Sequence, residues 1–96
     1  MPVCNVSLQI IPLVGEEEVY PIVDQAIKLI ADSGVNYIVG PMETTMEGNL
    51  DELLEIVKEA QAVCSAAGAE RILSVIKIDY SNRGVTMDEK VGKYQR

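Results

Sequence analysis

The segment from Asn36 to Asp51 carries the side chains whose types and spacing best fit the binding of a polar ligand. An apolar run ends there at a Gly-Pro break, and Thr44, Thr45 and Glu47 follow shortly afterwards. Their hydroxyl and carboxylate groups form hydrogen bonds with polar partners. A strand facing a buried core would carry valine or isoleucine at such positions. The segment therefore predicts either an exposed sheet edge or a binding site.

The composition excludes several kinds of chemistry. The 96 residues are expected to form one domain over residues 1–96, and they include no histidine, the commonest general base and metal ligand. Catalytic triads and most zinc sites are thereby excluded. The net charge of −7 disfavours nucleic acid as a partner, because phosphates require a basic surface. The same charge suits a cationic small ligand, and equally a well-solvated acidic protein with no such ligand.

The sequence also bears on the location of the protein and on the state of its two cysteines. The first residues begin a strand pattern without the basic and long apolar regions of a signal peptide, and no segment is long enough to cross a bilayer. We therefore expect a cytoplasmic protein that does not contact a membrane. Cys4 and Cys64 are too far apart in the sequence for a redox or metal-binding motif, and we expect both to be reduced and buried.

Apolar periodicity predicts the elements that must position these side chains. The alternating residues 3–11 predict a strand, and the helix after it is expected to start near Val19 or Tyr20, because Pro21 fits a first turn. This helix should end at Gly34. Further strands are predicted at residues 36–39, 44–47 and 71–79, a second helix from an N-cap at Asn49 to Gly68, and a short helix at residues 87–94.

This order predicts an α+β fold, the ferredoxin-like β-α-β-β-α-β sandwich, in which two helices cover one face of a four-stranded antiparallel sheet. Right-handed crossovers place the first and third strands side by side in its centre. In that arrangement Cys4 and Cys64 lie at opposite ends of the sheet, beyond the reach of a disulfide bond.

The face of the sheet away from the helices is expected to be polar. If Val6, Leu8 and Ile10 face the helices, the alternating side chains of the same strand face outward. The outward set is then Asn5, Ser7, Gln9, Thr45, Glu47, Leu73, Val75, Lys77 and Asp79. We expect another subunit to cover this face, with a ligand site inside the polar patch, and Lys77 and Asp79 to pair with each other or with that subunit.

Several runs of residues give the whole chain a resemblance to a known family. They are Asp32-Ser33-Gly34, Gly40-Pro41-Met42-Glu43-Thr44-Thr45-Met46-Glu47-Gly48, Gly68-Ala69-Glu70-Arg71 and Ile76-Lys77-Ile78-Asp79. In these runs the chain resembles the small thiamine-binding protein family. The resemblance implies a ferredoxin-like subunit of a homotetramer that binds thiamine or its hydroxymethylpyrimidine half and is not an enzyme, with no catalytic residue, metal or cofactor.

Thiamine has two ends that need different partners. Its aminopyrimidine edge suits a carboxylate and hydroxyls, for which Glu47 is the predicted carboxylate, and its thiazolium suits an aromatic face, for which Tyr37 is the nearest ring in the sequence. The predicted ligand-binding residues are therefore Glu47, Thr44, Thr45, Ser7, Gln9, Asn5 and Tyr37. Structural roles remain open for each: the threonines as strand residues beside a turn, Glu47 as a solvated edge charge, and Tyr37 as a core or interface residue.

The chain differs from the thiamine-binding protein family in two segments. Three glutamates precede the first helix where relatives often carry Ser or Thr, and Tyr80-Ser81-Asn82 has less charge than is usual there. The acidic loop predicts weaker binding of thiamine phosphate esters than of thiamine.

The function expected from the resemblance is a role in vitamin salvage, transport or sensing. Two alternatives stay open: a regulatory module that binds another metabolite between subunits, and a structural assembly subunit that has no ligand.

Overall fold

The computed structural model describes residues 2–94. Its elements are β1 (Cys4–Pro12), α1 (Glu16–Asp32), β2 (Asn36–Val39), β3 (Thr44–Gly48), α2 (Leu50–Ala66), β4 (Ile72–Asp79), α3 (Met87–Val91) and the 3-10 turn η1 (Gly92–Tyr94). The strands form one antiparallel sheet in the order β2-β3-β1-β4. The predicted ferredoxin-like α+β fold is confirmed, with the first and third strands in the centre and the short carboxyl-terminal helix present.

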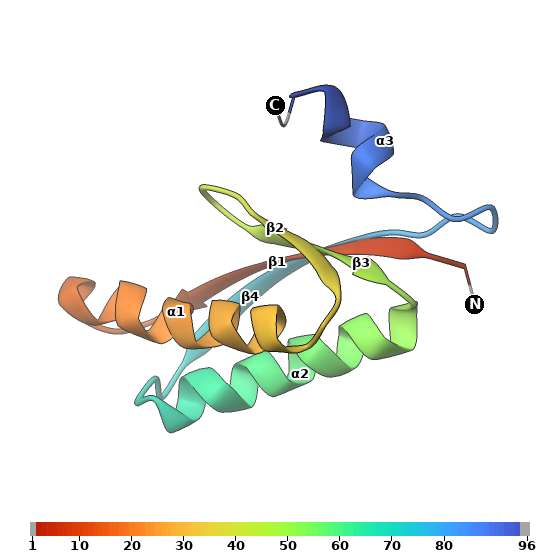
Figure 1. Cartoon of the computed structure of the whole chain (residues 1–96). Helices are drawn as coiled ribbons and strands as arrows, with labels where there is room; N and C mark the ends of the chain where they lie inside the picture. The colour runs from red at the N-terminus through yellow and green to blue at the C-terminus, as the bar shows by residue number, and fades with distance from the viewer. Residues whose placement is uncertain (1, 95–96) are drawn as a thin grey trace.

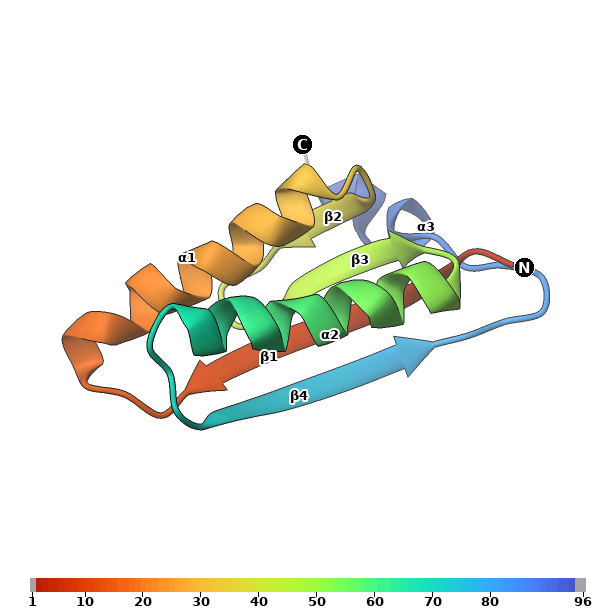
Figure 2. The ribbon, with the colours of Figure 1, turned by 90° about the horizontal axis from the view of Figure 1, so that it is seen from below.

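The two long helices lie side by side on one face of the sheet, and α3 lies on the other (Figures 1 and 2). The core fills the space between the sheet and these two helices, because the apolar stripe of each helix faces the apolar side of the strands. The buried apolar side chains that form it include Val6, Leu8, Ile22, Ala26, Ile30, Met46, Leu53, Ile56, Val57 and Ala60. The predicted alternation along β1 is therefore confirmed. No helix in residues 2–94 is long and apolar enough to span a membrane.

Helix α1 begins earlier than predicted. It starts at Glu16 with Gly15 as its N-cap, so the predicted start near Val19 is wrong and Pro21 lies inside the helix. The acidic first turn explains the difference, since three carboxylates there stabilise the positive end of the helix dipole. Pro21 and Glu17 are both exposed residues, and Pro21 leaves the carbonyl of Glu17 without its intrahelical donor.

The β2–β3 hairpin and the start of α2 are fixed by local contacts. Gly40 N–H donates to the carbonyl of Glu43 at 2.8 Å, and a Cβ on Gly40 would lie only 2.9 Å from that oxygen. The approach is therefore open only to glycine. At the start of α2, the Asn49 side chain accepts a hydrogen bond from Glu52 N–H at 2.9 Å, as the predicted N-cap should.

Both cysteines are free and buried, as predicted. Cys4 is opposite Gly48, which precedes α2, whereas Cys64 lies near the other end of that helix. Burial raises the pKa of both thiols above their ordinary value, and the nearby carboxylate of Asp79 raises that of Cys4 further. The thiols are therefore protonated near neutral pH and are poor nucleophiles.

Candidate functional site

The register of the sheet brings polar side chains from three strands into two rows on the face away from α1 and α2. Thr45, Ser7 and Lys77 are direct neighbours across β3, β1 and β4. The next row contains Glu47, Asn5 and Asp79. Directly opposed residues in antiparallel strands point to the same face, so all six side chains share this outer face.

A pocket of about 530 Å³ opens on this face, and we call it the sheet pocket. Its volume lies within the range of sites for small organic ligands. A second pocket of about 170 Å³ adjoins it below α3 and is lined by apolar side chains, namely Ile38, Met87 and Val91, besides the shared residues Asn5, Thr45 and Lys90. The residues that line the sheet pocket are Asn5, Ser7, Glu43, Thr45, Lys77, Ile78, Asp79 and Lys90.

Ser7 is the most informative residue of the sheet pocket. Its side chain is 6% exposed, and its Oγ has no hydrogen-bond partner within the chain. Among the side chains of residues 2–94 it is the buried polar atom without such a partner. A buried hydroxyl left unpaired costs about 1–3 kcal/mol, so the free energy of the site falls when a bound group supplies the missing hydrogen bond.

Two ion pairs form the walls of the sheet pocket. Lys77 Nζ lies 3.1 Å from a carboxylate oxygen of Glu43, which comes from the β2–β3 hairpin. Lys90 Nζ, from α3, lies 2.6 Å from Asp79 Oδ2 and donates to Asn5 Oδ1 at 2.7 Å. Lys77 and Asp79 do not pair with each other, because each has a partner from another element, and their pairing with a second subunit stays a prediction.

Glu47 lies on the outer face as predicted, but both of its carboxylate oxygens are already engaged. Oε1 accepts a hydrogen bond from the backbone N–H of Met87 at 2.7 Å, and Oε2 accepts one from Asn36 Nδ2 at 3.1 Å. The first contact satisfies a free donor at the start of α3, so Glu47 connects that helix to the sheet. Glu47 does not line the sheet pocket but a third pocket beside α3, which Asn36, Tyr37 and Asp88 also line.

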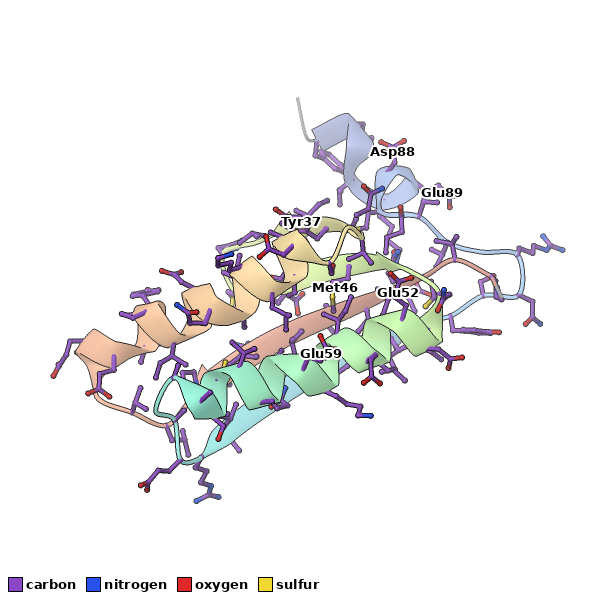
Figure 3. All side chains as sticks on the ribbon, turned by 60° about the horizontal axis from the view of Figure 1, so that its bottom comes forward. Tyr37, Met46, Glu52, Glu59, Asp88 and Glu89 are labelled. Carbon is purple, nitrogen blue, oxygen red and sulfur yellow. The ribbon has the colours of Figure 1, made fainter. Side chains whose placement is uncertain are left out.

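Three other predicted residues lie away from the sheet pocket. Thr44 is buried and points to the same side as Leu8, its neighbour on β1, which faces the helices. Tyr37 is opposite Met46 on the edge strand β2, and it lines a pocket beside α3 together with Glu47 (Figure 3). Gln9 faces outward but lines a separate pocket beside the β2–β3 loop.

The structure therefore brings together three predicted residues, Asn5, Ser7 and Thr45, and adds Glu43 and Lys90. The prediction about thiamine phosphate esters stays a prediction. The acidic first turn of α1, on which it rests, follows the far end of β1, whereas the sheet pocket lies near the start of that strand. These glutamates are remote from a ligand in the pocket. Within residues 2–94 no group of three or more cysteine, aspartate or glutamate side chains could hold a metal ion.

A comparison with known protein families shows to which of them the chain belongs. A family described as "Thiamine-binding protein" matches residues 6–95. The chain belongs to this family. A UPF0045 protein of Clostridium perfringens is 58% identical over 95 residues, which cover 99% of this chain and 100% of that protein.

Solved structures of similar proteins share the fold along nearly the whole chain. A DUF77 domain of unknown function from Bacillus cereus has a TM-score of 0.91 and 48% identity, with 98% of this chain and 91% of that one covered. A candidate thiamine biosynthesis or salvage protein from Thermotoga maritima has a TM-score of 0.92 and 36% identity, with 98% and 100% covered.

Two of the four runs that carried the resemblance to the thiamine-binding protein family meet at the sheet pocket. Residues 40–48 form the β2–β3 hairpin with β3 and supply Glu43 and Thr45, and residues 76–79 end β4 and supply Lys77 and Asp79. In this family member, Glu47 of the first run anchors α3 instead of lining the pocket. The role of Glu47 in ligand binding stays a prediction, and Glu43 and Asp79 are the carboxylates that line the sheet pocket.

Proposed function

We propose that the protein binds thiamine or its hydroxymethylpyrimidine half in the sheet pocket, without catalysis, and acts in vitamin salvage, transport or sensing in the cytoplasm. The observation that carries the proposal is Ser7, which lines a pocket of small-ligand size and whose buried hydroxyl has no partner within the chain. Family membership supplies the class of ligand.

The groups around Ser7 match the needs of an aminopyrimidine ring. Ser7 and Thr45 are neighbours in one row, and each hydroxyl both donates and accepts hydrogen bonds, as the ring nitrogens and amino group require. The carboxylate of Glu43 lines the same pocket and is the acceptor that we assign to the exocyclic amine in place of Glu47. Binding of the pyrimidine half then requires only local adjustment of the exposed Lys77, the present partner of Glu43.

Titration calorimetry with thiamine and with hydroxymethylpyrimidine tests this proposal. We expect saturable binding with one site per chain, and an unfolding free energy that rises by about 2.7 kcal/mol at a ligand concentration of 100 Kd. A panel of amino acids is the control. Binding of an amino acid in place of both thiamine compounds would favour a regulatory module, and no response to any of these metabolites would favour a structural subunit.

We further propose that the protein is a homo-oligomer, with a tetramer as the expected form. Strand β4 is an edge strand of eight residues, and β1 is its only partner within residues 2–94. An unpaired edge with apolar side chains on both sides attracts a further strand. Pairing with β4 of a second copy would continue the sheet and cover the exposed apolar side chains Leu73, Val75, Ile76, Ile78 and Tyr80.

Replacing Ile76 by lysine is expected to convert the oligomer to a monomer, because a charged side chain in the middle of the edge opposes strand pairing. Light scattering coupled to size exclusion should then give the mass of one chain, 10.5 kDa, in place of a multiple of it. Leu13→Lys is the matched control, since Leu13 is similarly exposed but lies outside the strands. A wild-type protein of 10.5 kDa, or an unchanged mass for Ile76→Lys, would contradict the β4 interface.

A further inference from the structure

The ammonium group of Lys90 occupies a small site of its own at the wall of the sheet pocket. Its Nζ lies 2.6 Å from Asp79 Oδ2 and 2.7 Å from Asn5 Oδ1, at the boundary between the sheet pocket and the apolar pocket below α3. A carboxylate and an amide oxygen that together surround a positive charge form a cation subsite. Lys90 is the present occupant of this subsite.

The charges of the pocket are balanced while Lys90 remains in place. Four charged side chains line the sheet pocket: Glu43 and Asp79 are negative, and Lys77 and Lys90 are positive. A cationic ligand therefore finds no excess negative charge there, and it must approach the ammonium of Lys90 to reach Asp79. If the Lys90 ammonium group moves into solvent, Asp79 can pair with the cationic ligand. The positive charge of the ligand then replaces that of Lys90 in the pocket.

The attachment of α3 allows Lys90 to leave at low cost. The helix has five residues, of which Met87 is buried, whereas the side chains of Asp88, Glu89 and Lys90 are exposed. It lies on the opposite side of the sheet from α1 and α2 and takes no part in the core (Figure 1). The tie from Glu47 to Met87 N–H holds the start of the helix, and Lys90 is one turn further on. A segment with so few buried contacts moves without unfolding the core.

We infer that Lys90 is a tethered competitor of the ligand: the thiazolium ring of thiamine binds at Asp79 and Asn5 and displaces the Lys90 ammonium group into solvent. The apolar pocket beside this subsite, lined by Ile38, Met87 and Val91, receives the rest of the ring. The inference rests on the proposed function, because it assigns one half of the same ligand. The pyrimidine half, which lacks the fixed charge, remains beside Ser7 and does not compete with Lys90.

The test compares Lys90→Met with the wild-type protein in calorimetric titrations of thiamine and of hydroxymethylpyrimidine at neutral pH. We expect the ratio of thiamine affinity to pyrimidine affinity to rise about two- to fivefold, the range set by loss of a half-exposed ion pair. Asp79→Asn should lower the same ratio. Lys90→Arg keeps the positive charge and should leave the ratio near the wild-type value.

Lys93→Met is the matched control, because it removes the same charge from the same segment. Lys93 Nζ lies over the ring of Tyr94, 5.1 Å from its centroid, and does not line the sheet pocket. An equal rise in the ratio for Lys93→Met, or a fall for Lys90→Met, would overturn the competitor role. If both ligands bind the wild-type protein and the ratio does not change in Lys90→Met, this inference fails alone. If neither ligand binds, the proposed function fails as well.

Discussion

Replacing Met46 by alanine is expected to lower the free energy of unfolding by about 2–5 kcal/mol, the largest effect that we predict for a single substitution. The Met46 side chain is fully buried in the middle of β3, between Val6 on β1 and Tyr37 on β2. Alanine loses the contacts of the longer side chain and leaves a cavity below the helices. Urea-induced unfolding at a fixed protein concentration measures the change, and the melting temperature should fall by at least about 8 °C.

Met42→Ala is the matched control for this prediction. The substitution is chemically identical, but the Met42 side chain is 75% exposed in the β2–β3 loop. We expect the free energy of unfolding to change by less than about 0.5 kcal/mol, as for most surface substitutions. Equal effects at the two methionines would contradict the placement of Met46 in the core between the sheet and the two long helices.

Replacing Ser7 by alanine is expected to affect stability and binding in opposite directions. The free energy of unfolding should stay constant or rise, because the substitution removes a buried hydroxyl that has no partner within the chain. Affinity for thiamine or hydroxymethylpyrimidine should fall by about three- to tenfold, which corresponds to one hydrogen bond of about 0.6–1.4 kcal/mol. Thermal unfolding and calorimetry on the same preparation measure both quantities.

Ser74→Ala provides the control with the opposite pattern. Ser74 Oγ donates to Gln61 Oε1 at 2.8 Å, in a contact between β4 and α2 on the helix side of the sheet. Its loss should cost about 0.5–1.5 kcal/mol of stability and leave ligand affinity unchanged. The site assignment would be wrong if Ser7→Ala behaved in the same way, with lower stability and full affinity, because the hydroxyl would then be a structural group.

The fold could be predicted from the sequence because period and capping agree along most of the chain. Alternation in β1 determined which face meets the helices, and Asn49 marked the start of α2. The start of α1 was missed because the prediction gave Pro21 more weight than the acidic residues before it. A proline inside a helix costs about 3 kcal/mol even at an exposed position, so a rule based on local sequence alone places it in the first turn.

Of the residues that line the sheet pocket, the sequence could predict only those that lie on strands. Asn5, Ser7 and Thr45 follow from alternation once the topology is known, since the register joins neighbouring strands. Glu43 comes from a turn, and Lys90 lies 85 residues from its partner Asn5. No periodic pattern relates such positions. The identity of the pocket carboxylates therefore depends on how a loop and a terminal segment fold back over the sheet, which only the three-dimensional structure reveals.

The burial of Cys4 and Cys64 allows a dye to be attached near α3 to monitor the movement of this helix. Because both native thiols are buried and their pKa values are raised, a maleimide dye at neutral pH should spare them. A cysteine introduced by Lys93→Cys would take the dye alone, without prior removal of either native residue. The labelled protein would become a fluorescent reporter in which departure of Lys90 from its subsite is read as a change in emission from the neighbouring turn.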